Sequence, residues 1–270
     1  MKLRQQARCL LHSSFIRGYS KSVVIIKSAH DVEKMRQAGR IVAEVLSLMK
    51  ERVQPGVTTG ELDALAHRVI IKAQALPSFK GYRGFPASIC ASVNEEIVHG
   101  IPGERVLKDG DIISVDVGTI FRGFQGDAAI TLGVGEISPE AKRLLEVTQG
   151  ALQAGIAQAR AGNHLGDISW AIQSYVEGRD LAVVREYTGH GIGRRMHEDP
   201  QIFNFGQPGQ GLELQSGMTM ALEPMVNLGD WRTRALNDGW TVVTMDGALS
   251  AHFEHTIAVM DGEAQILTRL

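Results

Sequence analysis

The stretch IISVDVGTIFRGFQGDAAITL, residues 112–132, decides the fold of this 270-residue chain. Two runs rich in β-branched residues, Ile112–Phe121 and Gln125–Leu132, flank the dipeptide Arg122-Gly123. Such runs, separated by a short glycine-containing turn, are typical of an antiparallel β-hairpin. The sequence therefore predicts a long hairpin around which the rest of the chain is arranged.

Each strand of this hairpin carries one aspartate, Asp116 and Asp127. In one register they lie directly opposite each other, and in the next they lie diagonally on the same face. Like charges on one face are unfavourable unless a cation lies between them. Taken alone, the pair favours the simpler interpretation of a turn-capping aspartate and an unrelated surface aspartate.

Helical patterns lie on both sides of the hairpin. Ser28 is a candidate N-cap before an apolar stripe that runs from Val32 to Met49, and Thr58 with Glu61 forms a capping box. Ser138-Pro139 opens a third helix, and a fourth is expected at about 166–176. Further strands are expected at 87–93, 183–188, 218–223, 241–245 and 253–260. The order, two helices then strands, occurs twice, which indicates a duplicated α+β fold with helices on one face of an antiparallel sheet.

Three more candidate ligands occur in apolar or glycine-rich surroundings. His190 lies within Gly-His-Gly-Ile-Gly, and Glu223 and Glu254 lie within the runs MALEPM and SAHFEHTI. An acid in such a run is costly to bury unless it is paired or bound to a metal. Four such acids with a histidine are best explained by a pair of divalent metal ions between them.

Composition sets broad limits. The chain is 44% hydrophobic and 21% charged, which is an ordinary globular balance, and its net charge of -2 argues against nucleic acid as the main partner. No apolar run reaches the roughly 18 residues of a membrane-spanning helix, so no membrane partner is expected. The two cysteines, Cys9 and Cys90, have no CxxC spacing, which fits a reducing compartment.

Residues 1–22 form a separate basic extension with five lysines and arginines and no acid. Such a segment is typical of an organellar transit peptide, but a basic tail or a start codon assigned too far upstream fits as well. We expect a single domain at 23–270, located in the cytoplasm. If residues 1–22 are a cleaved presequence, the location is instead a mitochondrial or plastid matrix.

The motifs resemble those of the methionine aminopeptidases of the pita-bread fold. The matching features are the Asp-x10-Asp pair, Gly-His-Gly-Ile-Gly, Leu222-Glu223-Pro224, Phe253-Glu254-His255-Thr256 and Val98-His99-Gly100-Ile101-Pro102. The resemblance covers about 23–268, in family order and spacing. The short N-terminal extension and the lack of an insertion before Glu223 resemble the compact type I enzymes.

The resemblance implies a site for two divalent metal ions per chain, Co, Mn, Fe or Zn. The implied ligands are Asp116, Asp127, His190, Glu223 and Glu254, with Asp127 and Glu254 as bridges. It also implies catalytic roles for His99 at the scissile amide nitrogen, His197 at the carbonyl oxygen and Glu223 in proton transfer. The methionine pocket implied by the family consists, together with His99 and His197, of Phe79, Tyr82, Phe85, Cys90, Met196 and Trp240.

The expected substrate is the N-terminal methionine of nascent polypeptides with a small second residue. A monomer is expected, and contact with the ribosome would suit such a substrate. Two alternatives share these motifs: an aminopeptidase specific for residues that precede proline, and a non-catalytic binding protein. The second alternative is disfavoured because all five implied ligands are present.

Overall fold

The computed structural model describes residues 24–270, so the basic extension 1–22 lies outside the described residues. Four α-helices are present in this part of the chain: α1 (Ala29–Arg52), α2 (Thr59–Lys72), α3 (Pro139–Gln158) and α4 (Leu165–Glu177). The strands of the first half are β1 (Leu76–Pro77), β2 (Ile89–Val93), β3 (Glu96–Val98), β4 (Ile112–Phe121) and β5 (Phe124–Gly133). Those of the second half are β6 (Ala182–Val183), β7 (Thr188–Gly191), β8 (Glu198–Phe203), β9 (Thr219–Leu222), β10 (Met225–Asn227), β11 (Thr233–Ala235), β12 (Val242–Thr244), β13 (Ser250–His252), β14 (His255–Ala258) and β15 (Gln265–Ile266).

The helices begin where the sequence predicts. The Ser28 side chain accepts a hydrogen bond from the Asp31 N–H, and the Asp31 carboxylate accepts one from the Ser28 N–H. Thr58 and Glu61 form the same reciprocal box before α2, and Ser138 caps α3. Each cap satisfies donors that the first helical turn leaves free, so these short polar motifs fix the helix boundaries.

The predicted hairpin is β4 and β5. Asp127 lies opposite Gly118, and Asp116 lies opposite Ala129, so the two aspartates are diagonal on one face. Helix α1 packs on the other side at very short range. A Cβ at Gly126 would lie 2.7 Å from the backbone nitrogen of Gly39, so glycine at 126 permits this approach.

The two halves of the chain meet along a seam between β5 and residues 252–256. Ala129 and Glu254 exchange backbone hydrogen bonds in both directions. On one side the Thr256 hydroxyl bridges both backbone groups of Asp127, and on the other the Thr131 hydroxyl bridges both backbone groups of His252. The two threonine bridges lie on either side of the Ala129–Glu254 contact and join the two halves of the chain.

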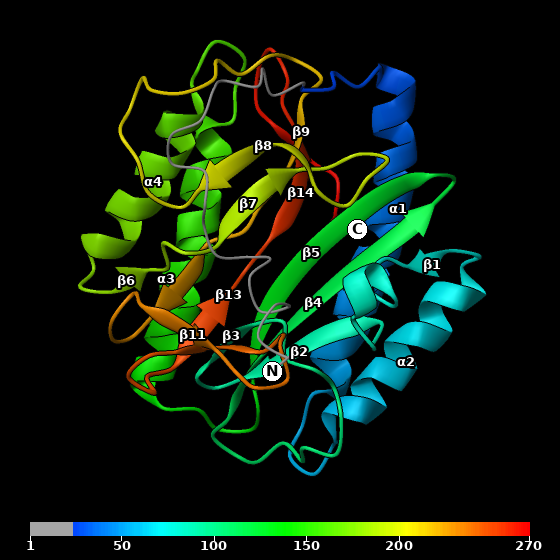
Figure 1. Ribbon diagram of the computed structural model, residues 1–270, viewed down its shortest axis with the longest axis vertical. Coiled ribbons are helices and arrows are strands. Elements are labelled where there is room, and N and C mark those ends of the chain that lie inside the picture. The colour runs from blue at the N-terminus through cyan, green and yellow to red at the C-terminus, as the bar shows by residue number, and fades with distance from the viewer. Residues whose placement is uncertain (1–23) are drawn as a thin grey trace, which may run out of the picture.

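All pairs of named strands are antiparallel. Helix α1 lies behind β4 and β5, and α3 lies behind β13 and β9 (Figure 1). Within the described residues, no helix is long and apolar enough to span a membrane.

One predicted strand is wrong. The segment 183–188 is not a continuous strand but a two-residue β6, a loop and the first residue of β7. Val183 pairs with Val226 of β10, whereas Val184, buried in a different hydrophobic cluster, lies beyond the end of β6, so the apolar run continues past the strand. Strand β8 was not predicted, because its buried positions hold Glu198, Pro200 and Ile202 while its exposed positions include Phe203.

Candidate metal centre and adjoining pocket

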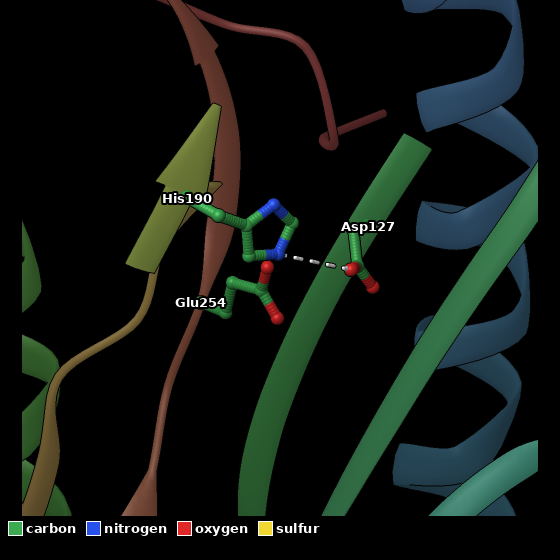
Figure 2. A group of neighbouring side chains, drawn as sticks. All are labelled: Asp127, His190 and Glu254. Carbon is green, nitrogen blue, oxygen red and sulfur yellow. Dashed lines mark ion pairs between the residues drawn. The ribbon is translucent and has the colours of Figure 1, made fainter. Parts of the chain in front are cut away.

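Five predicted ligands converge on the seam. Ligand atoms of Asp127, His190 and Glu254 lie within 4.8 Å of one another, although the residues come from β5, β7 and the link between β13 and β14 (Figure 2). His190 Nε2 lies 3.9 Å from Asp127 Oδ2 and 3.6 Å from Glu223 Oε1. Asp116 lies diagonal to Asp127 on the same face of the β4–β5 hairpin. The structure therefore brings all five residues together.

The ring of His190 is oriented for ligation. Its Nδ1 lies 2.9 Å from the carbonyl oxygen of Gly191, which can only accept, so Nδ1 carries the proton. Nε2 then presents its lone pair to the acids, as a metal-binding imidazole requires. The flanking glycines serve close strand packing: a Cβ at Gly189 would lie 2.4 Å from the Ala221 carbonyl oxygen, and one at Gly191 would lie 2.1 Å from that of Asp199.

Burial and mutual repulsion shift the pKa values of the site residues. Burial raises the pKa of Asp116 to about 7. Burial, and then the charge of Glu254 and Asp116, raises the pKa of Asp127 well above its ordinary value. The pKa values of Glu223 and Glu254 are raised for the same two reasons, and burial lowers the pKa of His190 to about 4. Each shift disfavours the charged form of its group; a divalent cation would restore the charge of the four acids and would bind the imidazole in its neutral form.

The residues present fit a metal centre. Within residues 24–270, three buried oxygens of these acids have no hydrogen-bond partner: Asp116 Oδ1, Asp127 Oδ1 and Glu254 Oε1. Buried polar atoms without partners are costly, and ions would satisfy all three. One imidazole among carboxylates suits Mn, Fe, Co or Zn.

The two predicted catalytic histidines flank the ligands. The ring centroid of His197 lies 4.3 Å from that of His190, and Tyr82 Oη lies 2.8 Å from His197 Nδ1. His99 has a left-handed backbone with φ of 61°, and its buried Nδ1 has no hydrogen-bond partner among the described residues. Non-glycine residues in this conformation are strained and cluster at functional sites.

The predicted pocket residues adjoin the centre. Cys90 pairs with Asp116 across β2 and β4, which places both side chains on the same face. Phe85 stacks edge-on against Trp240 with centroids 5.1 Å apart, and both pack with Cys90. Two further predicted pocket residues, Phe79 and Met196, pack against Gly118. A Cβ at this position would lie only 2.8 Å from Phe79 and 2.9 Å from Met196, so glycine leaves the space that they occupy.

Sequence reasoning missed several residues that support the site. His252 is 1% exposed, and its Nε2 lies 3.7 Å from Glu223 Oε2. The Thr256 hydroxyl holds the backbone of Asp127. The ring of Tyr187 lies 6.0 Å from that of His99. All three depend on contacts between distant segments, and the only local signal is the position of His252 and Thr256 on either side of Glu254.

Comparisons with known proteins agree with this geometry. Residues 33–261 match metallopeptidase family M24. The chain is 54% identical to methionine aminopeptidase 1 of Bacillus subtilis over 92% of its own length and 100% of that protein. It is 52% identical to a methionine aminopeptidase of Clostridium perfringens, over 91% of this chain and 99% of the relative.

Solved structures give the same result. The crystal structure of methionine aminopeptidase from Thermotoga maritima matches with a TM-score of 0.91 at 46% identity, over 92% of this chain and 100% of the other. A prolidase from Pyrococcus furiosus matches with a TM-score of 0.74 at 18% identity, over 91% of this chain and 66% of the other, which shows a shared fold alone. The expected pita-bread fold is thereby confirmed, and the chain belongs to metallopeptidase family M24.

Proposed function

We propose that this protein is a methionine aminopeptidase that removes the N-terminal methionine from polypeptides with a small second residue. The observation that carries the proposal is the convergence of Asp116, Asp127, His190, Glu223 and Glu254 beside buried apolar and aromatic side chains. Relatives about half identical over nearly their whole length are methionine aminopeptidases, which supports the same activity here.

The five ligands would hold two divalent ions, drawn from Co, Mn, Fe and Zn. The family resemblance assigns Asp127 and Glu254 to both ions; these two acids are the most deeply buried of the five, at 4% and 2% exposed, and their ligand atoms lie within 4.8 Å of each other. Asp116 would complete one site, and His190 with Glu223 the other. When bound, such ions supply a water whose pKa is lowered to about 7.

The surrounding side chains would orient the peptide and move its protons. If the Tyr82 hydroxyl donates to His197 Nδ1, the other ring nitrogen carries a proton that can stabilise an oxyanion at the first peptide carbonyl. His99, held rigidly by its backbone, would contact the scissile amide nitrogen. The Glu223 carboxylate, next to His190 and His252, would carry a proton to the leaving amine.

The pocket explains the choice of methionine. Phe79, Tyr82, Phe85, Met196 and Trp240 provide aromatic and thioether surface, and a flexible thioether packs well against such surface. The thiol of Cys90 is buried, and burial followed by the charge of Asp116 raises its pKa well above the ordinary value. We therefore expect a neutral thiol in the wall of the pocket.

Three properties of the cellular context stay predictions. We expect the protein to act as a monomer on chains emerging from the ribosome. We expect it in the cytoplasm, or in a mitochondrial or plastid matrix if residues 1–22 are removed as a presequence. Sequencing the N-terminus of the protein isolated from its own cells distinguishes these locations.

The activity is tested with two peptides. The protein is stripped of metal, reloaded with Mn²⁺ or Co²⁺, and assayed for amino-acid release from Met-Ala-Ser and from Ala-Pro-Ser. We expect metal-dependent release of methionine from the first peptide. Faster cleavage of the proline peptide would instead assign the chain to the aminopeptidases that act before proline.

A further inference from the structure

A buried ion pair lies beside the metal centre and includes none of its proposed ligands. Lys27 Nζ lies 2.6 Å from Glu198 Oε2, and the two side chains are only 5% and 2% exposed. Lys27 precedes the N-cap of α1, and Glu198 opens β8, so the pair joins distant parts of the chain.

The pair is held from several sides. Lys27 Nζ also donates to the Ile25 carbonyl oxygen, and the Lys27 backbone N–H donates to that of Gly217. The second carboxylate oxygen, Glu198 Oε1, accepts a hydrogen bond from the Arg195 backbone N–H. Besides the ion pair itself, each of the two side chains therefore makes one hydrogen bond to a backbone group, Lys27 to Ile25 and Glu198 to Arg195.

The pair packs against the turn 193–198. A Cβ at Gly193 would lie 2.6 Å from Lys27 Cε and 2.7 Å from Glu198 Oε1, so the pair occupies the space that glycine leaves free. The turn is anchored on its other side, where the Gln125 backbone N–H donates to the Gly193 carbonyl oxygen. The turn is thus clamped between β5, which carries Asp127, and the segment before α1.

This turn carries two residues of the proposed site. Met196 is 3% exposed and packs in an apolar cluster with Phe79 and Tyr82, and the ring of His197 lies 4.3 Å from that of the proposed ligand His190. His197 itself is exposed, and its side chain makes one hydrogen bond within the described residues, to Tyr82. Its position therefore depends on the backbone of the turn.

A buried ion pair is a poor source of net stability, because desolvation offsets most of the attraction. Its directional bonds can still fix one geometry. We propose that Lys27 is a positioning residue, which acts through Glu198 to fix the turn 193–198 and thereby places His197 and Met196 against the substrate. This proposal rests on the proposed peptidase activity, and it makes the segment before α1 part of the active-site architecture.

The test compares four variants of the full-length protein: Lys27→Met, Glu198→Gln, the double variant, and Lys142→Met as a control. Lys142 forms an exposed pair with Glu136 at 3.7 Å, so the control makes the same chemical change at a surface site. We expect kcat for Met-Ala-Ser to fall about tenfold to a hundredfold in the double variant, because small displacements of catalytic groups cost up to about 10² in rate. Its Mn²⁺ content should equal that of wild type, and the control should keep wild-type kcat.

The double variant separates positioning from stability. Each single variant leaves one buried charge or acid without its partner and should lower Tm, whereas the double variant removes both charges and should recover most of that loss. Under the proposal, kcat does not recover with Tm. Recovery of wild-type kcat with Tm would overturn it.

A spectroscopic measurement covers the case in which the enzyme assay fails. The ring ¹H–¹³C resonance of His197, assigned with a His197→Gln variant, is compared in metal-free wild type, the double variant and the control. The proposal predicts a shifted or broadened resonance in the double variant alone, and an unchanged resonance would contradict it. An inactive wild type would refute the proposed function, while this comparison would still decide the role of Lys27.

Discussion

The side chain of His197 illustrates how single residues define this site. Its Nδ1 lies 2.8 Å from Tyr82 Oη, and its ring lies tilted beside that of a proposed metal ligand, His190, with centroids 4.3 Å apart. The two roles proposed for His197, oxyanion donor and part of the methionine pocket, would both depend on the orientation of this ring. Gly118 is a second example of a single residue that shapes the site, because the absence of a side chain there makes room for Phe79 and Met196.

Removing the Tyr82 hydroxyl tests the assigned orientation of His197. Tyr82→Phe should lower kcat up to about tenfold, the cost of one neutral hydrogen bond. His197→Ala should lower kcat by about 10²–10³, as does the loss of an oxyanion donor. Steady-state kinetics with Met-Ala-Ser measures both. Effects confined to KM would show that neither residue acts in the transition state.

Asp127 tests the proposed bridging position. Asp127→Asn keeps the shape of the side chain but removes the charge, so we expect loss of metal binding and of activity while the fold is retained. Metal content is measured by mass spectrometry after loading with Mn²⁺, with the exposed Asp261→Asn as the control. A variant that carries as much metal as the control would exclude Asp127 as a bridge.

At the scale of elements, the hairpin and the helix caps could be predicted from sequence because each rests on local patterns. The alternation of β4 and β5 and the box at Thr58 and Glu61 involve residues close in the chain. The seam could not be predicted, because the contact of Thr256 with Asp127 joins residues 129 positions apart. The pair of Lys27 and Glu198 escaped prediction for the same reason.

The convergence of the five ligands was predicted from more than one kind of evidence. The diagonal placement of Asp116 and Asp127 follows from strand periodicity and was one of two predicted registers. The union of these aspartates with His190, Glu223 and Glu254 was inferred from the cost of burying acids in apolar surroundings and from the family resemblance, since no local pattern specifies how β5, β7 and β14 meet. The segment at 183–188 shows the limit of apolar runs as a strand signal.

The two threonines at the seam between β5 and residues 252–256 give a prediction in which one variant serves as the control for the other. Thr256→Val replaces the hydroxyl that bridges both backbone groups of Asp127, and Thr131→Val makes the same change at His252. Each buried group left unpaired costs about 1–3 kcal/mol, so both variants should unfold at lower Tm. Thr256→Val should also weaken Mn²⁺ binding about tenfold or more, because it loosens a bridging ligand. Calorimetric titration that finds equal affinities in the two variants would contradict this reading of the seam.

At the scale of the whole molecule, the metal-free fold carries acids that resist ionisation. Folding raises the pKa of Asp116 from 3.8 to about 7 and raises those of Asp127, Glu223 and Glu254. The folded state therefore holds protons that the unfolded chain has released, and this contribution to stability is lost as pH rises. Buried histidines contribute to the pH dependence of stability with the opposite sign. Their pKa values in the folded state lie below 6.5, so the stability of the fold decreases as pH falls and they must be protonated. These histidines are His99, His190, His252 and His255.

Above about pH 7.5, roughly one unit above the unfolded-state pKa of histidine, the histidines are mostly neutral in both states, and the acids decide the trend. The Tm of the metal-free protein should thus fall as pH rises above about 7.5, whereas that of the Mn²⁺-loaded protein should change little because ions replace the protons. Differential scanning calorimetry across this range checks the prediction. A rising Tm in the metal-free protein would mean that the acids are already ionised in the fold.

The claim on which the function rests is that metal ions hold these acids together at the seam between the two halves. An anomalous difference map from crystals of the active, Mn²⁺-loaded protein, recorded near the manganese edge, tests it most directly. The account predicts two peaks, both within coordination distance of Asp127 and Glu254, one also beside Asp116 and the other beside His190 and Glu223. A map from active crystals with no peak among these five side chains would contradict it.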